Sequence, residues 1–154
     1  MVEPPTPDAA GDGITIVRVF DAPREQVWRE WTEPEPFADW FGGGEAEVPV
    51  STVSMDVRVG GAWRATMFAD GGRREIQWHG DYREVVEPER LVFTVYDRPG
   101  DEYELVTVVL TDLGAGRTEM LFKQRGRMTP EQYEHAEHGW SGFFDRMAKH
   151  LADA

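Results

Sequence analysis

The pattern of hydrophobic and polar positions predicts one strand and then two short helices at the start of the chain. Residues 14–20, ITIVRVF, alternate between apolar and polar side chains, a period typical of a strand with one buried face. In residues 21–31, DAPREQVWREW, apolar side chains recur at helical spacing, and Asp21 is placed to cap that helix. A proline then ends it, so we expect a second short helix at about 34–40.

From about residue 50 the pattern changes to strands separated by turn residues. The sequences DGG, EPER and GAG stand where the chain must reverse, which favours antiparallel neighbours. Gly80, inside a long alternating segment, indicates a β-bulge. We expect strands at residues 51–59, 61–69, 74–87, 90–97, 103–113 and 117–126.

The last segment has the pattern of one long amphipathic helix. Thr129 is placed to cap it, and Pro130 suits its first position. With about 100° of rotation per residue, the apolar residues that follow fall on a single stripe. They are Tyr133, Ala136, Trp140, Phe143, Phe144, Met147 and Leu151.

These elements predict an α+β fold with a curved antiparallel sheet of about six or seven strands. Laying the long C-terminal helix across the concave side of the sheet is the simplest way to bury its apolar stripe. The two short N-terminal helices are expected to plug one end of the groove. The domain should span residues 14–152, because residues 1–13 are rich in Pro, Gly and Asp and are interpreted as a disordered lead.

Composition and charge narrow the classes of function. With 154 residues and no cysteine, the chain fits one domain without disulfides or thiol chemistry. Its formal net charge of −13 argues against a nucleic-acid partner, because phosphate contacts need clustered basic residues. No apolar run is long enough to span a membrane, and the N-terminus lacks the features of a secretory signal. We therefore expect a cytoplasmic protein.

The aromatic residues supply the main candidates for a binding site. The chain has six tryptophans, and large rings occur both in ligand sites and in packed cores. Rigid rings fill a concave space incompletely, so we expect an apolar cavity between the sheet and the long helix. The alternative is that the same rings simply fill the core. The candidate ligand-binding residues are Trp31, Phe37, Trp40, Phe41, Trp63, Met67, Trp78, Tyr82, Phe93, Tyr96, Gln124, Trp140 and Phe144.

A few polar residues could give this cavity chemistry. Tyr82 and Glu84 are in phase on one predicted strand, so either could act as an acid or base if it were buried there. Gln124, near the end of the last strand, could orient the polar end of a ligand. The alternative for Glu84 is a structural ion pair with an arginine such as Arg64 or Arg83. Tyr82 and Glu84 stay candidates only, and a binding protein is favoured over an enzyme.

The sequence predicts neither a metal site nor a cofactor. Glu131, His135 and His138 share one helix face, as metal ligands can, but that face is opposite the apolar stripe and should be a solvated charged surface. The sequence has no phosphate-cradling glycine loop, dinucleotide fingerprint, HExxH pair or nucleophile elbow. The three glycines at 42–44 lack the context of a phosphate loop and are interpreted as a hinge.

Four segments resemble the START-like, or SRPBCC, superfamily, whose helix-grip fold has this order of elements. Within it, the chain is most similar to the bacterial proteins grouped with the activator of the heat-shock protein 90 ATPase. The segments are VFDAPREQVWREWTEPEPFADWF, VRVGGAWRATM, GDYREVVEPERLVFTVY and GWSGFFDRMAKHLA, and the resemblance covers about residues 14–152.

The resemblance implies an internal cavity that takes a small hydrophobic or aromatic molecule, such as a lipid or polyketide, without a cofactor. Two alternatives come with it. One is a cofactor-independent cyclase or hydrolase that uses a cavity carboxylate or tyrosine, and the other is a protein that interacts with heat-shock protein 90. An exposed sheet edge also allows a homodimer.

Overall fold

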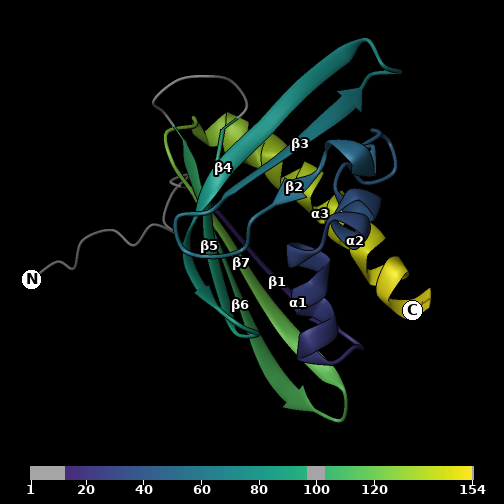
Figure 1. Ribbon diagram of the computed structural model, residues 1–154, viewed down its shortest axis with the longest axis vertical. Helices are drawn as coiled ribbons and strands as arrows, with labels where there is room; N and C mark the ends of the chain where they lie inside the picture. The colour runs from purple at the N-terminus through teal and green to yellow at the C-terminus, as the bar shows by residue number, and fades with distance from the viewer. Residues whose placement is uncertain (1–12, 97–102, 154) are drawn as a thin grey trace, which may run out of the picture.

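A computed structural model describes residues 13–96 and 103–153 of the chain (Figure 1). The elements within these residues follow the predicted order. They are β1 (Gly13–Phe20), α1 (Arg24–Thr32), α2 (Pro34–Trp40), the 3-10 helix η1 (Val50–Thr52), β2 (Ser54–Met55), β3 (Ala62–Ala69), β4 (Arg74–Val86), β5 (Arg90–Val95), β6 (Glu104–Gly114), β7 (Arg117–Arg125) and α3 (Pro130–Asp153).

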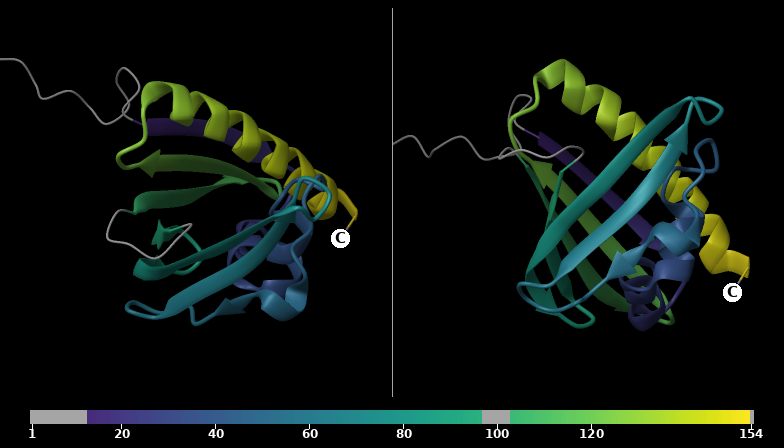
Figure 2. Two further views of the ribbon diagram at one scale, coloured as in Figure 1. Left: turned by 90° about the horizontal axis from the view of Figure 1, so that it is seen from above. Right: turned by 45° about the horizontal axis from the view of Figure 1, so that its top comes forward.

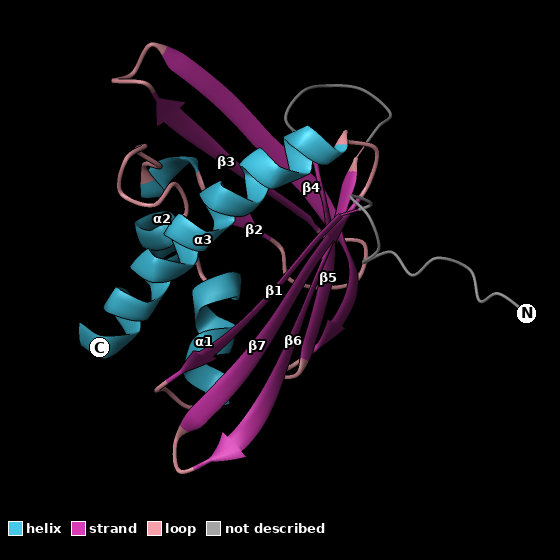
Figure 3. Ribbon diagram, turned by 180° about the vertical axis from the view of Figure 1, so that it is seen from behind, coloured by secondary structure: helices cyan, strands magenta, loops and turns pink. Residues whose placement is uncertain are grey.

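The strands form one antiparallel sheet of seven strands, in the order β1-β7-β6-β5-β4-β3-β2. The sheet is curved, and α3 runs along its open side beside β1 (Figure 2). Seen from behind, α1 and α2 lie at the end of the sheet near the C-terminal half of α3 (Figure 3). The predicted helix-grip fold, with a sheet wrapped around a long C-terminal helix and two short helices, is confirmed.

The long helix α3 begins where its sequence predicts. The backbone N–H of Gln132 donates to Thr129 Oγ1 at 3.1 Å, and the N–H of Thr129 donates to Gln132 Oε1 at 2.8 Å. This reciprocal pair satisfies donors that the first turn of a helix leaves free. The predicted apolar stripe faces the sheet, because its buried members are Tyr133, Trp140, Phe144, Met147 and Leu151.

Two local predictions are wrong. Helix α1 begins at Arg24 after Pro23, and no side chain caps it, so Asp21 does not serve as its cap. Predicted strand 51–59 contains only the last two residues of η1 and the two-residue β2. The chain turns back directly after β2, and a Cβ added to Gly61 would lie 2.0 Å from the carbonyl oxygen of Asp56. Such a close turn leaves no length for a longer strand.

A β-bulge occurs in β4, but not at Gly80. The register between β4 and β5 shifts between Tyr82 and Glu84. At Gly80 the neighbouring strand instead comes unusually close, because an added Cβ would lie 1.8 Å from the carbonyl oxygen of Thr94. Glycine is therefore required there for close strand packing, and the bulge two residues later changes which side chains face inward.

The predicted lead, residues 1–13, lies outside the described residues except for Gly13, the first residue of β1. Residues 97–102, which hold the last residue of the predicted strand 90–97 and the connection to the predicted strand 103–113, also lie outside them. Among the helices of the described residues, none is long and apolar enough to cross a membrane.

Candidate functional site

The described core contains an internal space of about 10 Å³ on the concave side of the sheet. This volume holds about one water molecule. The space lies between the sheet and the two short helices α1 and α2, and no residue of α3 lines it, whereas the sequence predicts a cavity between the sheet and the long C-terminal helix. At this volume the nearly filled interior does not admit an organic molecule in this conformation. The space is lined by Trp31, Phe37, Met55, Trp63, Tyr82 and Phe93.

Trp31, on α1, lies at the centre of the aromatic core. Its ring centroid is 4.8 Å from that of Trp40 and 6.0 Å from those of Phe93 and Phe144. Rings at such distances, tilted or edge to face, pack favourably. The alternative expectation, that the rings simply fill the core, therefore describes this conformation well.

One polar atom in this packed lining has no partner. The indole Nε1 of Trp31 is buried and finds no hydrogen-bond acceptor among the described residues. Two other core tryptophans differ: Trp40 Nε1 donates to Glu30 O at 2.8 Å, and Trp63 Nε1 donates to Thr94 O at 2.9 Å. A buried donor without an acceptor costs about 1 to 3 kcal/mol. Trp78 Nε1 is also unpartnered, but Trp78 does not line the internal space.

Tyr82, on β4, contributes the phenol of the lining. Its side chain is buried, and this burial, helped by the negative charge of Asp56, raises the pKa of Tyr82 well above its usual value. The hydroxyl therefore keeps its proton at any physiological pH. It is suited to hydrogen bonding with a guest, and poorly suited to act as a base.

Glu84 does not reach the interior, so the prediction that it is in phase with Tyr82 is wrong. The bulge between the two residues turns the Glu84 side chain outward, where it is 46% exposed. Its carboxylate oxygen accepts a hydrogen bond from Arg90 Nε at 3.0 Å. The expected structural ion pair exists, but with Arg90 in place of Arg64 or Arg83.

Gln124 is buried, yet its amide is already used by the protein. Its Oε1 accepts from Trp140 Nε1 at 2.7 Å, and its Nε2 donates to Glu104 Oε1 at 3.0 Å. The same carboxylate hydrogen-bonds Tyr133, whose pKa is raised to about 12, mainly by burial. Gln124 thus fixes α3 to the sheet and is not free to orient a ligand.

The structure divides the predicted ligand-binding residues into three groups. Tyr96 is half-buried away from the internal space and stacks on His79, with ring centroids 5.0 Å apart. The members brought together around the internal space are Trp31, Phe37, Trp63, Tyr82 and Phe93. The remaining members pack in or against the core outside this lining: Trp40, Phe41, Met67, Trp78, Gln124, Trp140 and Phe144.

Two residues of this region were not predicted from the sequence. Met55 lines the internal space from β2, but the predicted strand 51–59 gave no reason to single it out. Glu30 is buried in α1 beside Trp31. A polar residue next to the apolar stripe of a helix is the signal that could have marked it.

The buried carboxylate of Glu30 lies within ion-pair distance of His150 of α3, whose side chain is partly exposed. The Nδ1 atom of His150 is 2.9 Å from Glu30 Oε2, and the side chain of His150 is 35% exposed while that of Glu30 is 4% exposed. Burial raises the pKa of Glu30 from 4.5 to about 7, while His150 opposes this shift and the charge of Asp39 adds to it. The pair connects α1 to the C-terminal half of α3.

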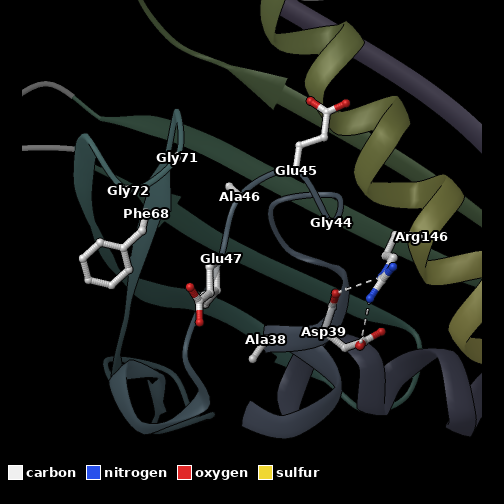
Figure 4. A pocket seen from close by; sticks show the side chains of 11 residues that line it. Ala38, Asp39, Gly44, Glu45, Ala46, Glu47, Phe68, Gly71, Gly72 and Arg146 are labelled. Atoms are coloured by element: carbon white, nitrogen blue, oxygen red, sulfur yellow. Dashed lines mark hydrogen bonds and ion pairs between the residues drawn. The ribbon is translucent and has the colours of Figure 1, made fainter.

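A second ion pair connects α2 to α3 one turn away. Arg146 Nε donates to the backbone oxygen of Asp39 at 3.3 Å, and its terminal NH2 group lies 3.5 Å from the Asp39 carboxylate (Figure 4). Both side chains are about 40% exposed, at 41% and 37%. These contacts border an open groove of about 470 Å³ between α2, the loop after it and the tip of the β3–β4 hairpin. The groove is lined by Ala38, Asp39, Gly44, Glu45, Ala46, Glu47, Val48, Phe68, Gly71, Gly72 and Arg146.

The predicted solvated face of α3 is exposed at Glu131, His135 and His138. In residues 13–96 and 103–153, no group of three or more His, Cys, Asp or Glu side chains is arranged to hold a metal ion.

Comparison of the sequence with known protein families identifies one family. The sequence model of the family described as "Activator of Hsp90 ATPase homolog 1-like protein" matches residues 21–152. No curated protein shows a significant match to the chain.

Solved structures share the whole fold. Protein CV1439 from Chromobacterium violaceum is 25% identical, with 92% of this chain and 98% of that chain covered and a TM-score of 0.81. Protein NE0264 from Nitrosomonas europaea is 25% identical, with 94% and 96% covered and a TM-score of 0.79. The AHSA1 (SPO3351) protein from Silicibacter pomeroyi is 21% identical, with 91% and 97% covered and a TM-score of 0.79, and supports the fold alone.

Proposed function

The chain belongs to the family of Activator of Hsp90 ATPase homolog 1-like proteins, and on this premise we propose that it binds a small, uncharged, largely apolar molecule inside its core. The fold of this family is consistent with a ligand-binding domain. The guest is expected to occupy the region of the internal space, between the sheet and the two short helices, after the rings there move apart.

The observation that carries this proposal is the unpartnered Nε1 of Trp31, one of the six residues that line the internal space. Buried donors without acceptors are rare in folded proteins, because each one costs free energy that a partner would recover. A guest with one hydrogen-bond acceptor, such as a carbonyl oxygen, would supply that partner. Its apolar remainder would pack against Phe37, Trp63 and Phe93.

The lining also indicates what the guest is not. Its six side chains include no carboxylate and no basic group, and the phenol of Tyr82 keeps its proton. A charged guest would lose its hydration without gaining a counter-charge, which is strongly unfavourable. We therefore favour a neutral aromatic or polycyclic molecule over a fatty acid or other anion.

A pair of matched probes tests the proposal by isothermal titration calorimetry. 2-Acetylnaphthalene and 2-isopropylnaphthalene have nearly the same shape, but only the first has an acceptor. In a purely apolar pocket the isopropyl compound would bind more tightly, because the ketone oxygen would be desolvated without a partner. We expect saturable binding with a preference for the ketone, and little binding of 2-naphthoate. If neither neutral probe shows detectable binding up to its solubility limit, or if 2-naphthoate binds more tightly than both, the proposal is overturned.

The two alternatives have weaker support. A cyclase or hydrolase would have to depend on Tyr82, because Glu84 lies at the surface. A chaperone-linked role is suggested by the name of the family alone. A cytoplasmic location, a homodimer and the lack of a nucleic-acid partner stay predictions from the sequence.

A further inference from the structure

Helix α2 lies between the closed internal space and the open groove. Phe37, in the middle of α2, lines the internal space. Ala38 and Asp39, the next two residues, line the groove on the outside (Figure 4). A small movement of this one helix toward the groove would therefore draw Phe37 away from the internal space, and the groove of about 470 Å³ gives it room.

The segments on either side of α2 would allow such a movement. Glu33, which joins it to α1, has an extended backbone, with φ −117° and ψ 137°. After α2 come Gly42, Gly43 and Gly44, with φ values of 102°, 69° and 84°. Glycine adopts positive φ values at little cost, whereas other residue types do not. The backbone angles of these three residues can therefore change more easily than those of other residues.

Helix α1 is held by polar contacts near both of its ends. The pair of Glu30 and His150 fixes it to α3, and Thr118 Oγ1 donates a buried hydrogen bond to Ala22 O at 2.7 Å just before it. The outer side of α2 is joined to α3 by the Asp39–Arg146 pair, which is partly exposed. Exposed ion pairs contribute little to stability, so this contact can open without a large loss.

Met55, on the opposite wall of the internal space, is a less suitable place to open. Its strand β2 pairs with β3 in the sheet, with Ser54 opposite Arg64 and Met55 opposite Trp63. Moving β2 would break backbone pairing, whereas moving α2 would separate side chains. Trp40, at the C-terminal end of α2, is fully buried and donates to Glu30 O, so this one hydrogen bond to α1 must also break when α2 moves.

We propose that α2 is a lid over the interior, held closed by Asp39 on Arg146 and moving about the glycines at 42–44 to admit the guest. This inference rests on the proposed function, since a lid needs a guest. It assigns Phe37 as the ring that blocks the site in the closed state, where it packs on Phe41 and Trp63 at centroid distances of 4.6 and 6.0 Å.

A reversible cross-link tests the lid, because the chain has no cysteine of its own. The double variant Asp39→Cys/Arg146→Cys is joined by a bismethanethiosulfonate whose spacer matches the length of the two lost side chains. The control, Thr111→Cys/Glu119→Cys, cross-links a directly opposed pair on β6 and β7, away from α2. The probe is 2-acetylnaphthalene, and its association rate is followed by stopped-flow tryptophan fluorescence.

We expect the cross-linked Asp39→Cys/Arg146→Cys variant to bind the probe at least about tenfold more slowly than the same variant after reduction. The control should bind equally fast in both states. An unchanged rate in the cross-linked lid variant, with the probe still bound, would overturn the lid and leave the proposed function intact. Absence of binding in the reduced variants and in the unmodified protein would overturn the proposed function, and the lid with it.

Discussion

His150 Nδ1 lies within hydrogen-bond distance of both carboxylate oxygens of Glu30, at 2.9 and 3.0 Å, although 120 residues separate them in the sequence. The contact joins the first helix of the chain to the last across the aromatic core. Because Glu30 is almost completely buried, its charge depends mainly on that burial and on this partner. Protonation of this pair should therefore be visible in the stability of the whole domain.

The pH dependence of stability follows from the raised pKa of Glu30, from 4.5 to about 7. The folded state holds the proton more tightly than the unfolded state. Its stabilising effect is therefore complete below pH 4.5 and is lost as the pH rises through 7. Chemical unfolding of the wild type and Glu30→Gln should show the wild type losing stability relative to the variant, by up to about 1.4 kcal/mol per pH unit. A constant difference between the two proteins across this range would contradict the assignment.

His150→Phe should move this loss of stability to higher pH. The charge of His150 and its hydrogen bond both lower the pKa of Glu30, against the larger effect of burial. Without them, Glu30 should stay protonated further into the alkaline range. The same unfolding experiment, run to about pH 9, reports the shift, and a profile that moves toward acid would rule out the stabilising role of His150.

Trp31→Phe should remove the preference for an acceptor while keeping an aromatic side chain at this position. We expect the selectivity for 2-acetylnaphthalene over 2-isopropylnaphthalene to fall by about 3- to 10-fold, the value of one net hydrogen bond. Trp63→Phe is the matched control, because Trp63 lines the same space but its Nε1 already donates to Thr94. Calorimetry that shows equal losses in both variants would contradict the role of the Trp31 donor.

Glu84→Gln should have little effect. Glu84 is at the surface in an ion pair with Arg90, and such pairs contribute about 0 to 1 kcal/mol. We expect the free energy of unfolding to change by less than about 1 kcal/mol, with unaltered affinity for 2-acetylnaphthalene. A large loss of affinity would show that Glu84 reaches the guest, and would reopen the enzyme alternative.

Two glycine substitutions should have opposite effects on stability. Gly80→Ala places a Cβ 1.8 Å from the Thr94 oxygen and should cost about 2 to 4 kcal/mol, because two strands must separate. Gly139→Ala, in the exposed face of α3 with open space around it, should stabilise the protein by up to about 1 kcal/mol. Denaturant titration measures both changes, and a tolerated Gly80→Ala would show that the close approach of β4 and β5 is not required.

Local signals in the sequence were enough to predict most of the fold. Pro34 set the start of α2, which ends at Trp40 as expected. The helical spacing of rings in α3 identified its buried stripe, and alternation placed most strands. These features depend only on residues a few positions apart, so the sequence alone is enough to predict them.

The rest depends on contacts that local patterns do not contain. Whether Glu84 faces inward is decided by the register of β4 on β5, and the bulge after Tyr82 reverses the alternation there. The pairing of Glu30 with His150 needs two distant helices to meet. The size of the internal space is set by how the rings pack, so its closure over about 10 Å³ could not be predicted from their number. Tyr96 is different, because it is three residues from Phe93 and strict alternation already places the two on opposite faces.

The indole N–H resonance of Trp31 offers the most direct test of the central claim. It can be identified in a two-dimensional ¹H–¹⁵N spectrum as the tryptophan signal that Trp31→Phe removes. On addition of 2-acetylnaphthalene we predict that this proton shifts downfield, as it gains a hydrogen bond, and that the shift saturates with the calorimetric affinity. The resonance of Trp63, already hydrogen-bonded to Thr94, should move less. If the probe binds and the Trp31 signal stays in place, the guest does not use the unpartnered donor and the account is wrong.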